Sequence, residues 1–442
     1  MNHQKIQNAP ITLRKKLSFL GPGFILSASI VGSGELIATT ILGAKAGFIT
    51  FWVILVSCII KVGIQLEFGK NAIISGKPIM SEFNSFKGPR LSHGNWTLWM
   101  TFLLTSLKIL QIGGMLGGAA IAFSMIFLSI PIQASVVLLG LSISLLVYKN
   151  YYKLIEKIAT IMVFVFTFFT LISLIGLFFT PFSFSFEDVL TGLSFQLPNE
   201  YLFVAIGAFG ITGVASDEII AYTYWCQEKG YAVFTGLNDG SEEWKMRAKG
   251  WIKVMYLDAL VAMLCYTIVT ASFYLLGAAV LHGNDLVPEG NDLIAYLAAI
   301  YTNSLGPGAR IGFLVGAFIA LYSSVFATLA YWSRLFPDIF NQLNWWQIQN
   351  QADKDNSVKI LAWLFPVLWI ITYLFLELPA FMVLIGGVIG SVLLLVVVYA
   401  AILFRRKNQF LKLDSSILSR SIFWLSVISI IFISAYGILK LF

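Results

Sequence analysis

Inside two long apolar stretches of this sequence, acidic residues stand beside glycine, alanine and serine. Glu35 ends the run Gly-Ser-Gly-Glu that starts at Gly32, and Asp217 and Glu218 end the run Gly-Val-Ala-Ser-Asp-Glu that starts at Gly213. A charge at the centre of a membrane-spanning helix costs about 2.5–3.5 kcal/mol on insertion scales, so these acids require a polar cavity or a partner. Glycines beside them favour interrupted helices, whose free carbonyls can hold an ion or a polar substrate.

The two runs together form the predicted substrate site. Glu35 is the expected principal anionic ligand of a metal ion, with Glu218 as the second ligand or a gate; the alternative for Glu35 is a carboxylate that only packs against a neighbouring helix. Asp217 is expected either to line the site or to serve as the N-cap of a half-helix that begins at Glu218. Backbone carbonyls and hydroxyls complete the set, from Gly32, Gly34, Gly213 and Ala215 and from Ser33 and Ser216.

The composition indicates that membrane-spanning helices position these residues. Of 442 residues, 58% are hydrophobic and only 12% are charged, about half the charged fraction of a globular domain, which excludes a soluble protein. Apolar stretches long enough to cross a bilayer run from residue 19 almost to the C-terminus, so we expect one transmembrane domain over residues 1–442. Eleven spans are predicted, at about 19–44, 48–74, 96–128, 131–148, 154–179, 200–226, 252–281, 309–333, 358–377, 380–404 and 419–441.

The net charge of +7 follows from membrane topology. With the N-terminus in the cytoplasm, 24 of the 29 Lys and Arg residues fall on the cytoplasmic side of the predicted spans, as the positive-inside rule requires. The basic excess is therefore no nucleic-acid footprint. We expect an integral protein of a bacterial inner (plasma) membrane, with the C-terminus outside.

A weak internal repeat relates the two acidic runs. Shifting the chain by 183 residues aligns residues 33–48 with 216–231, and six of the sixteen positions are identical, Glu35 and Glu218 among them. Chance similarity between small-residue helices is the alternative. Because the aligned segments lie in spans 1 and 6, the unit is five helices, and an odd unit inverts the second copy in the membrane. The predicted fold is all-α and polytopic, with repeats at about 19–179 and 200–404, spans 1 and 6 broken, and an extra helix at 419–441.

Gly-Pro-Gly-Phe opens span 1 at residues 21–24, and Gly-Ser-Gly-Glu interrupts it at residues 32–35. These segments resemble the opening motif and the Asp-Pro-Gly-Asn metal-binding break of the natural resistance-associated macrophage protein (NRAMP) family of proton-coupled divalent-metal transporters, which have the LeuT-type fold. Residues 75–77, 258–263 and 323–330 are similar to signatures of the second, seventh and eighth spans. The resemblance implies a secondary-active transporter that works by alternating access.

The ligand chemistry departs from that family. Its Asp and Asn ligands fall on Gly32 and Glu35, and its Met-Pro-His falls within residues 213–216. Oxygen ligands suit hard cations such as Mg²⁺ or Mn²⁺ better than softer transition metals. The family's third-span acids fall on Lys108 and Gln111, so proton coupling of the usual kind is in doubt; these two and Asp258 are the candidate coupling or ion-pathway residues. Lys108 is expected either to pair with one of the glutamates or to reach a membrane surface.

A second resemblance keeps the substrate open. The Gly-Ser-Gly run is also similar to the first-helix break of amino-acid/polyamine/organocation transporters, which implies a small organic cation or an amino acid instead of a metal. A non-transporting membrane sensor on the same fold is the alternative of another class. With no intramembrane His, no CxxC and no P-loop, we expect no enzyme, no bound cofactor and no use of ATP. The expected partners are a small ion or solute and the bilayer, for a protein that can act as a monomer, with proton or sodium coupling left open.

Overall fold

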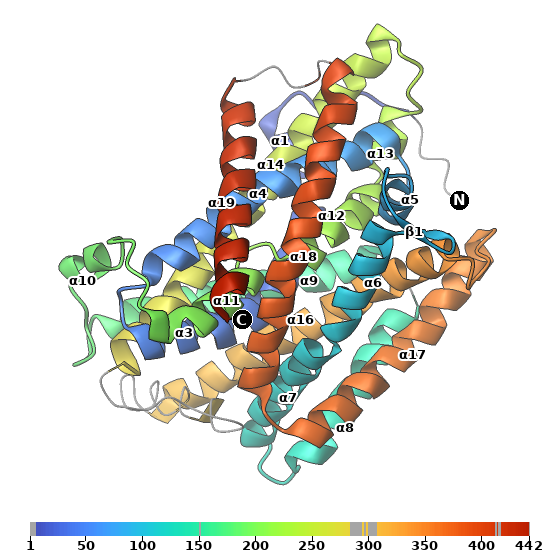
Figure 1. Cartoon of the computed structure of the whole chain (residues 1–442). Coiled ribbons are helices and arrows are strands. Elements are labelled where there is room, and N and C mark those ends of the chain that lie inside the picture. The colour runs from blue at the N-terminus through green and yellow to red at the C-terminus, as the bar shows by residue number, and fades with distance from the viewer. Residues whose placement is uncertain are drawn as a thin grey trace.

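The computed structural model of the chain describes residues 6–149, 152–282, 307–411 and 417–441, together with 294, 295, 298 and 413. Helices make up almost all of this part (Figure 1), so the all-α prediction is confirmed. The strands found there are two residues long each: β1 (Arg90–Leu91) pairs antiparallel with β2 (Gly94–Asn95).

The first predicted repeat contains helices at all five of its spans. Span 1 consists of α2, η1 and α3, span 2 of α4, span 3 of α6 and α7, and spans 4 and 5 of α8 and α9. The helices of this half are α1 (Leu13–Leu17), α2 (Pro22–Ile30), the π-helix η1 (Val31–Thr39), α3 (Thr40–Ala46), α4 (Phe51–Ser75), α5 (Ile79–Asn84), α6 (Trp96–Leu107), α7 (Ile109–Ile126), α8 (Ile132–Tyr148), α9 (Tyr152–Leu177) and α10 (Phe186–Thr191).

The second half has the same match between predicted spans and helices. Span 6 is divided between α11 and α12, and spans 7 to 11 are α14, α16, α17, α18 and α19. The helices here are η2 (Asn199–Tyr201), α11 (Leu202–Ile211), α12 (Ser216–Lys229), α13 (Tyr231–Thr235), α14 (Glu242–Val280), α16 (Pro307–Gln342), α17 (Gln351–Leu376), α18 (Pro379–Asn408), η3 (Gln409–Leu411) and α19 (Ile417–Leu441).

Length and hydropathy support the membrane assignment. Among the described residues, eight helices are long and apolar enough to cross a membrane, and the bent pair formed by Pro22–Ile30 and Gly34–Ala46 makes a ninth crossing. The 17-residue α8 and the 26-residue α9 occupy the two remaining predicted spans. Some helices are longer than the predicted span. The helix α14 has 39 residues, because polar turns at its N-terminus precede the apolar stretch that marked span 7.

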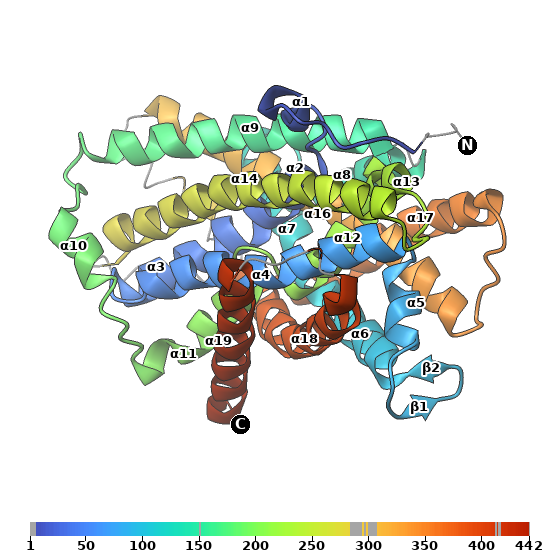
Figure 2. The same ribbon diagram turned by 90° about the horizontal axis from the view of Figure 1, so that it is seen from above.

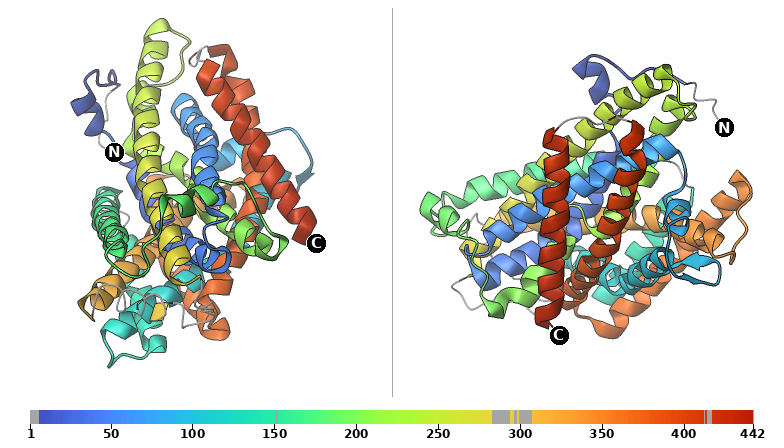
Figure 3. Two further views of the ribbon diagram at one scale, coloured as in Figure 1. Left: turned by 90° about the vertical axis from the view of Figure 1, so that its left-hand side faces the viewer. Right: turned by 45° about the horizontal axis from the view of Figure 1, so that its top comes forward.

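Three packing relations hold the broken spans in place. The helix α14 lies between α4 and α9 (Figure 2), and in the left-hand view of Figure 3 it descends from the top of the molecule through most of its height. The helix α16 packs against α7 and η1, and α11 packs against α18. At the last contact, a Cβ added to Gly207 would lie 3.1 Å from the carbonyl oxygen of Leu384. Small residues at such places let membrane helices approach closely.

Candidate functional site

Span 6 breaks where the glycine pattern predicts. The helix α11 ends at Ile211, α12 begins at Ser216, and residues 212–215 between them are not helical. Gly213 has a φ of +60°, in the left-handed region that favours glycine. A Cβ there would also lie only 2.8 Å from Cα of Cys58 in α4. The break therefore depends on glycine both for its conformation and for its packing against span 2.

Span 1 is broken in a different way. Its middle third, Val31–Thr39, is a π-helix, and the axis bends by 41° between Pro22–Ile30 and Gly34–Ala46. The N–H of Gly32 donates to Ser324 Oγ (2.8 Å), and that hydroxyl donates to the carbonyl of Ala28 (2.9 Å). A π-helical segment is often found at functional sites, but it keeps more of its carbonyls within the helix than an unwound segment does. Span 6 consequently supplies the non-helical backbone at the site.

Glu35 connects three spans at this point. Its carboxylate is fully buried, and Oε1 accepts hydrogen bonds from the N–H of Gly213 in the span 6 break (3.2 Å) and from Thr270 Oγ1 in α14 (2.7 Å). The other oxygen, Oε2, is buried without a hydrogen-bond partner among the described residues. An unpartnered buried carboxylate oxygen is costly, so Oε2 is the atom that a bound cation would stabilise.

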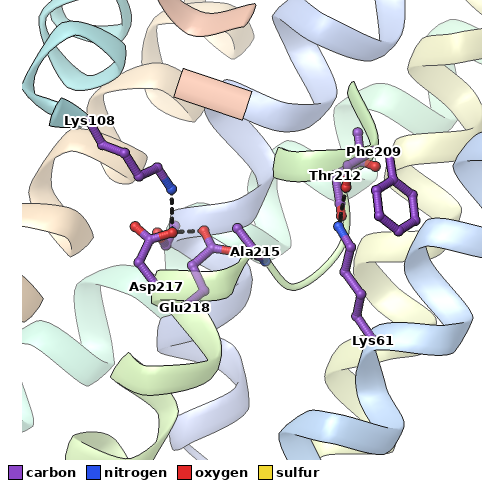
Figure 4. Close-up of polar contacts among 8 residues, drawn as sticks. Lys61, Lys108, Phe209, Thr212, Ala215, Asp217 and Glu218 are labelled. Atoms are coloured by element: carbon purple, nitrogen blue, oxygen red, sulfur yellow. Dashed lines mark hydrogen bonds and ion pairs between the residues drawn. The ribbon is translucent and has the colours of Figure 1, made fainter. Parts of the chain in front are cut away.

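Glu218 caps the second half of span 6 (Figure 4). Its Oε2 accepts the N–H of Ala215 (2.8 Å), and its Oε1 accepts the hydroxyl of Ser29 in α2 (2.9 Å). The carboxylate thus lies between the two broken spans. The carbonyl of Ala215 accepts the first hydrogen bond of α12, from the N–H of Ile219 (2.9 Å), so the predicted ligand role of this carbonyl competes with a helical bond.

Asp217 has a different role from the predicted N-cap. It is the second residue of α12, and its Oδ1 forms an ion pair with Nζ of Lys108 (Figure 4). Lys108 stands between α6 and α7 with 1% of its surface exposed, so it does not reach a membrane surface. An internal ion pair was one of the two expectations for this lysine, but its partner is the aspartate next to Glu218 and not a glutamate.

Lys61 is the residue at the break that the sequence did not mark as part of the site. It lies fully buried in α4, and its Nζ donates to the carbonyls of Phe209 and of Thr212 (2.8 Å for Thr212) at the end of α11 (Figure 4). The same ammonium lies 4.6 Å from the centroid of the Phe209 ring. The signal in the sequence was a lysine inside an apolar span, but nothing there showed that it reaches span 6.

Four further residues of the predicted site are Gln111, Ser216, Gly34 and Ser33. Gln111 is buried with Oε1 lacking a partner among the described residues, and Ser216 Oγ is likewise buried and unpartnered there. A Cβ at Gly34 would lie 2.7 Å from the carbonyl of Ile211, so Gly34 belongs to the crossing of spans 1 and 6. The side chain of Ser33 lies outside the described residues.

Asp258 is occupied at the start of span 1. Its two carboxylate oxygens accept the N–H groups of Gly21 (2.8 Å) and Gly23 (2.6 Å), and Oδ2 also accepts the hydroxyl of Tyr222 (2.9 Å). These bonds satisfy free N–H groups at the N-terminus of α2 and connect spans 1, 6 and 7. The structure thus shows an anchoring role for Asp258, while its predicted place in an ion pathway remains a prediction.

Counted at their formal charges, the ionisable groups at the two breaks have one more negative than positive charge. Three carboxylates, of Glu35, Asp217 and Glu218, stand against the two ammonium groups of Lys61 and Lys108, all of them buried. Among the described residues, no group of three or more His, Cys, Asp or Glu is arranged to hold a metal ion. A cation at this place would therefore bind one or two carboxylates together with hydroxyls, carbonyls and water. Such oxygen ligands are those that hard cations prefer.

The sequence matches a known family over most of its length. Residues 23–440 match the family model described as natural resistance-associated macrophage protein-like. A divalent metal cation transporter of Caldanaerobacter subterraneus is 28% identical over 63% of this chain, and an uncharacterized protein of Pasteurella multocida is 23% identical over 73%. The matched segments span 62% and 70% of the lengths of those two relatives.

Solved structures confirm the expected LeuT-type fold. A manganese transporter of Eremococcus coleocola superimposes with a TM-score of 0.74 at 17% identity, over 99% of this chain and 90% of that one. The structure of MhsT in complex with L-phenylalanine gives a TM-score of 0.60 at 15% identity, over 99% and 100%. At these identities the likeness concerns the fold, which is shared by structures bound to very different ligands.

Proposed function

Because the chain belongs to the natural resistance-associated macrophage protein-like family, we propose that it is a secondary-active transporter that carries a hard divalent cation, such as Mn²⁺ or Mg²⁺, by alternating access. The observation that carries this proposal is the buried Glu35. Its Oε1 joins span 1 to spans 6 and 7, while its Oε2 has no hydrogen-bond partner in the part of the chain that the structure describes. A divalent cation that binds Oε2 would supply the missing partner. The family is one of membrane transporters and not of enzymes.

The proposed binding site lies between the two broken spans. Glu35 Oε2 and the carboxylate of Glu218 supply the charge, and the hydroxyls of Ser29 and Ser216 together with water supply neutral oxygens. The bond between Glu218 and Ser29 joins the two broken spans, so displacement of this hydroxyl by a cation would let α2 and α12 move relative to each other. Such rocking of broken helices about a midplane site is the general mechanism of transporters built from repeats.

The proposed orientation is the one that the charge distribution favours, with the N-terminus in the cytoplasm and the C-terminus outside a plasma membrane. The proposal includes a single transmembrane domain over residues 1–442. No bound cofactor is part of it.

Isothermal titration calorimetry of the detergent-purified protein tests the substrate class. We expect binding heat with Mn²⁺ and Mg²⁺ and weaker binding of the softer Cd²⁺, because the charged ligands of the proposed site are carboxylates. A panel of amino acids and small organic cations should give no heat. The matched control is Glu242→Gln, at an acid outside the site whose side chain is 79% exposed; it should leave the Mn²⁺ heat unchanged. Saturable heat with an amino acid and none with either metal would favour the organic-substrate alternative and contradict the proposal.

A further inference from the structure

The carbonyl end of α11 is a place where a membrane helix stops inside the protein. The last carbonyls of a helix have no intrahelical partner and carry the negative end of the helix dipole. In a bilayer such groups must be satisfied from within the protein, because no bulk water reaches them. Thr212, at the C-cap of α11, is fully buried, so another group of the protein must satisfy its carbonyl.

The neutralising group is the ammonium of Lys61. It donates to the carbonyls of Phe209 and Thr212, and Ser57 Oγ, one turn earlier in α4, lies 3.1 Å from each of the same two oxygens. The hydroxyl of Thr212 donates to Ser57 Oγ (2.9 Å) and so fixes this arrangement. Two carbonyls thus converge on one positive charge, with the Ser57 hydroxyl as a second, neutral donor to the same oxygens.

A cation-binding group of this composition would ordinarily hold an inorganic ion. In transporters with broken helices, unwound carbonyls and the C-terminal ends of half-helices coordinate Na⁺ or a similar co-ion. The ring of Phe209 adds a further attraction for a positive charge at this place. In this chain the positive charge belongs to the protein, since Lys61 extends from the neighbouring span into the position of the ion.

We infer that Lys61 is a tethered cation: its ammonium fills a monovalent-cation site at the end of α11, so that the native protein takes no inorganic ion there. The Lys61 ammonium is covalently attached to α4 and cannot leave the site, so Na⁺ cannot be a co-transported ion at this place. Removing the ammonium leaves the carbonyls of Phe209 and Thr212 and the Ser57 hydroxyl facing a space of ionic size. The inference rests on the proposed function only for its statement about co-transport.

Thermal unfolding of Lys61→Ala in detergent tests the inference without any flux measurement. Sodium chloride should raise the Tm of this variant by about 2 °C or more over N-methyl-D-glucamine chloride at equal ionic strength, because a ligand that binds only the folded state stabilises it. Lys61→Gln should fold but show no sodium response, since its amide fills the same space with a neutral donor. Lys229→Ala is the matched control, because Lys229 also donates to a backbone carbonyl, that of Leu20 (3.0 Å), away from the break.

An equal response to sodium in Lys61→Ala and in the wild-type protein would overturn the inference. The wild-type protein gives an independent test if Lys61→Ala fails to fold. Sodium should shift its Tm, relative to N-methyl-D-glucamine, no more than it shifts the Tm of Lys61→Gln, and a sodium effect that Lys61→Gln lacks would also overturn the inference. Because the Tm comparison needs no transported substrate, the inference about Lys61 can hold even if the metal proposal fails. Likewise, the metal proposal can hold if the inference about Lys61 fails.

Discussion

Replacing Glu35 by glutamine should lower metal uptake by roughly 10- to 100-fold while the protein stays folded. A charge-assisted interaction contributes about 1.5–3 kcal/mol, and each 1.4 kcal/mol corresponds to a factor of ten in affinity. Glutamine keeps a carbonyl oxygen that can accept the bonds from Gly213 and Thr270, so the connection among spans 1, 6 and 7 survives. Initial rates of Mn²⁺ uptake, normalised to folded protein from size-exclusion chromatography, measure the effect.

The matched comparison for this variant is Thr270→Val, which removes a hydrogen bond to Oε1 and keeps the carboxylate charge. It should lower uptake far less than Glu35→Gln if the charge of Glu35 binds the cation. Equal losses in the two variants would mean that Glu35 acts only by fastening the spans together, which is the packing alternative that the sequence left open.

Replacing Lys108 by methionine should cost about 3–5 kcal/mol of folding stability, the usual penalty for leaving one member of a buried ion pair uncompensated. Lys108 and Asp217 are both almost completely buried, with side-chain exposures of 1% and 7%. We expect a clear fall in Tm and in the yield of folded protein. The double variant Lys108→Met/Asp217→Asn should recover part of the loss, because no uncompensated charge remains.

The control for the ion pair is Lys245→Met. Lys245 pairs with Glu242 at 2.6 Å, but the two side chains are 31% and 79% exposed, and exposed ion pairs contribute little. This variant should unfold close to the wild-type temperature. If Lys108→Met also unfolds at that temperature, or if the double variant recovers nothing, the ion pair does not hold span 3 to span 6 as the structure indicates.

The sequence was sufficient to place the helices and the two breaks. Apolar length located all eleven spans, because a bilayer demands long apolar segments, and the glycines within the two acidic runs located the breaks. The form of the span 1 break was not predictable, since a π-helix and an unwound segment have the same composition. The Gly-Ser-Gly run lies inside η1 in the structure.

Contacts between spans far apart in the chain were the part that the sequence could not supply. Asp217 was expected either to line the site or to serve as the N-cap of a half-helix that begins at Glu218. In the structure α12 starts at Ser216, and Glu218 itself reaches back to the N–H of Ala215. Lys61 carries no local pattern that points to the end of α11, 148 residues later in the chain. Such partners depend on which helices pack together, and a hydropathy pattern does not contain that information.

The central claim is that the site between the broken spans carries a hard divalent cation across the membrane. Its most direct test is Mn²⁺ flux into proteoliposomes that hold the purified protein and an internal metal-sensitive dye, with Mg²⁺ as competitor. The account predicts saturable Mn²⁺ entry that Mg²⁺ inhibits and that protein-free liposomes lack. Binding of Mn²⁺ without any entry would identify a sensor, and no effect of Mn²⁺ or Mg²⁺ alongside entry of an amino acid would identify an organic-solute transporter; either result would contradict the account.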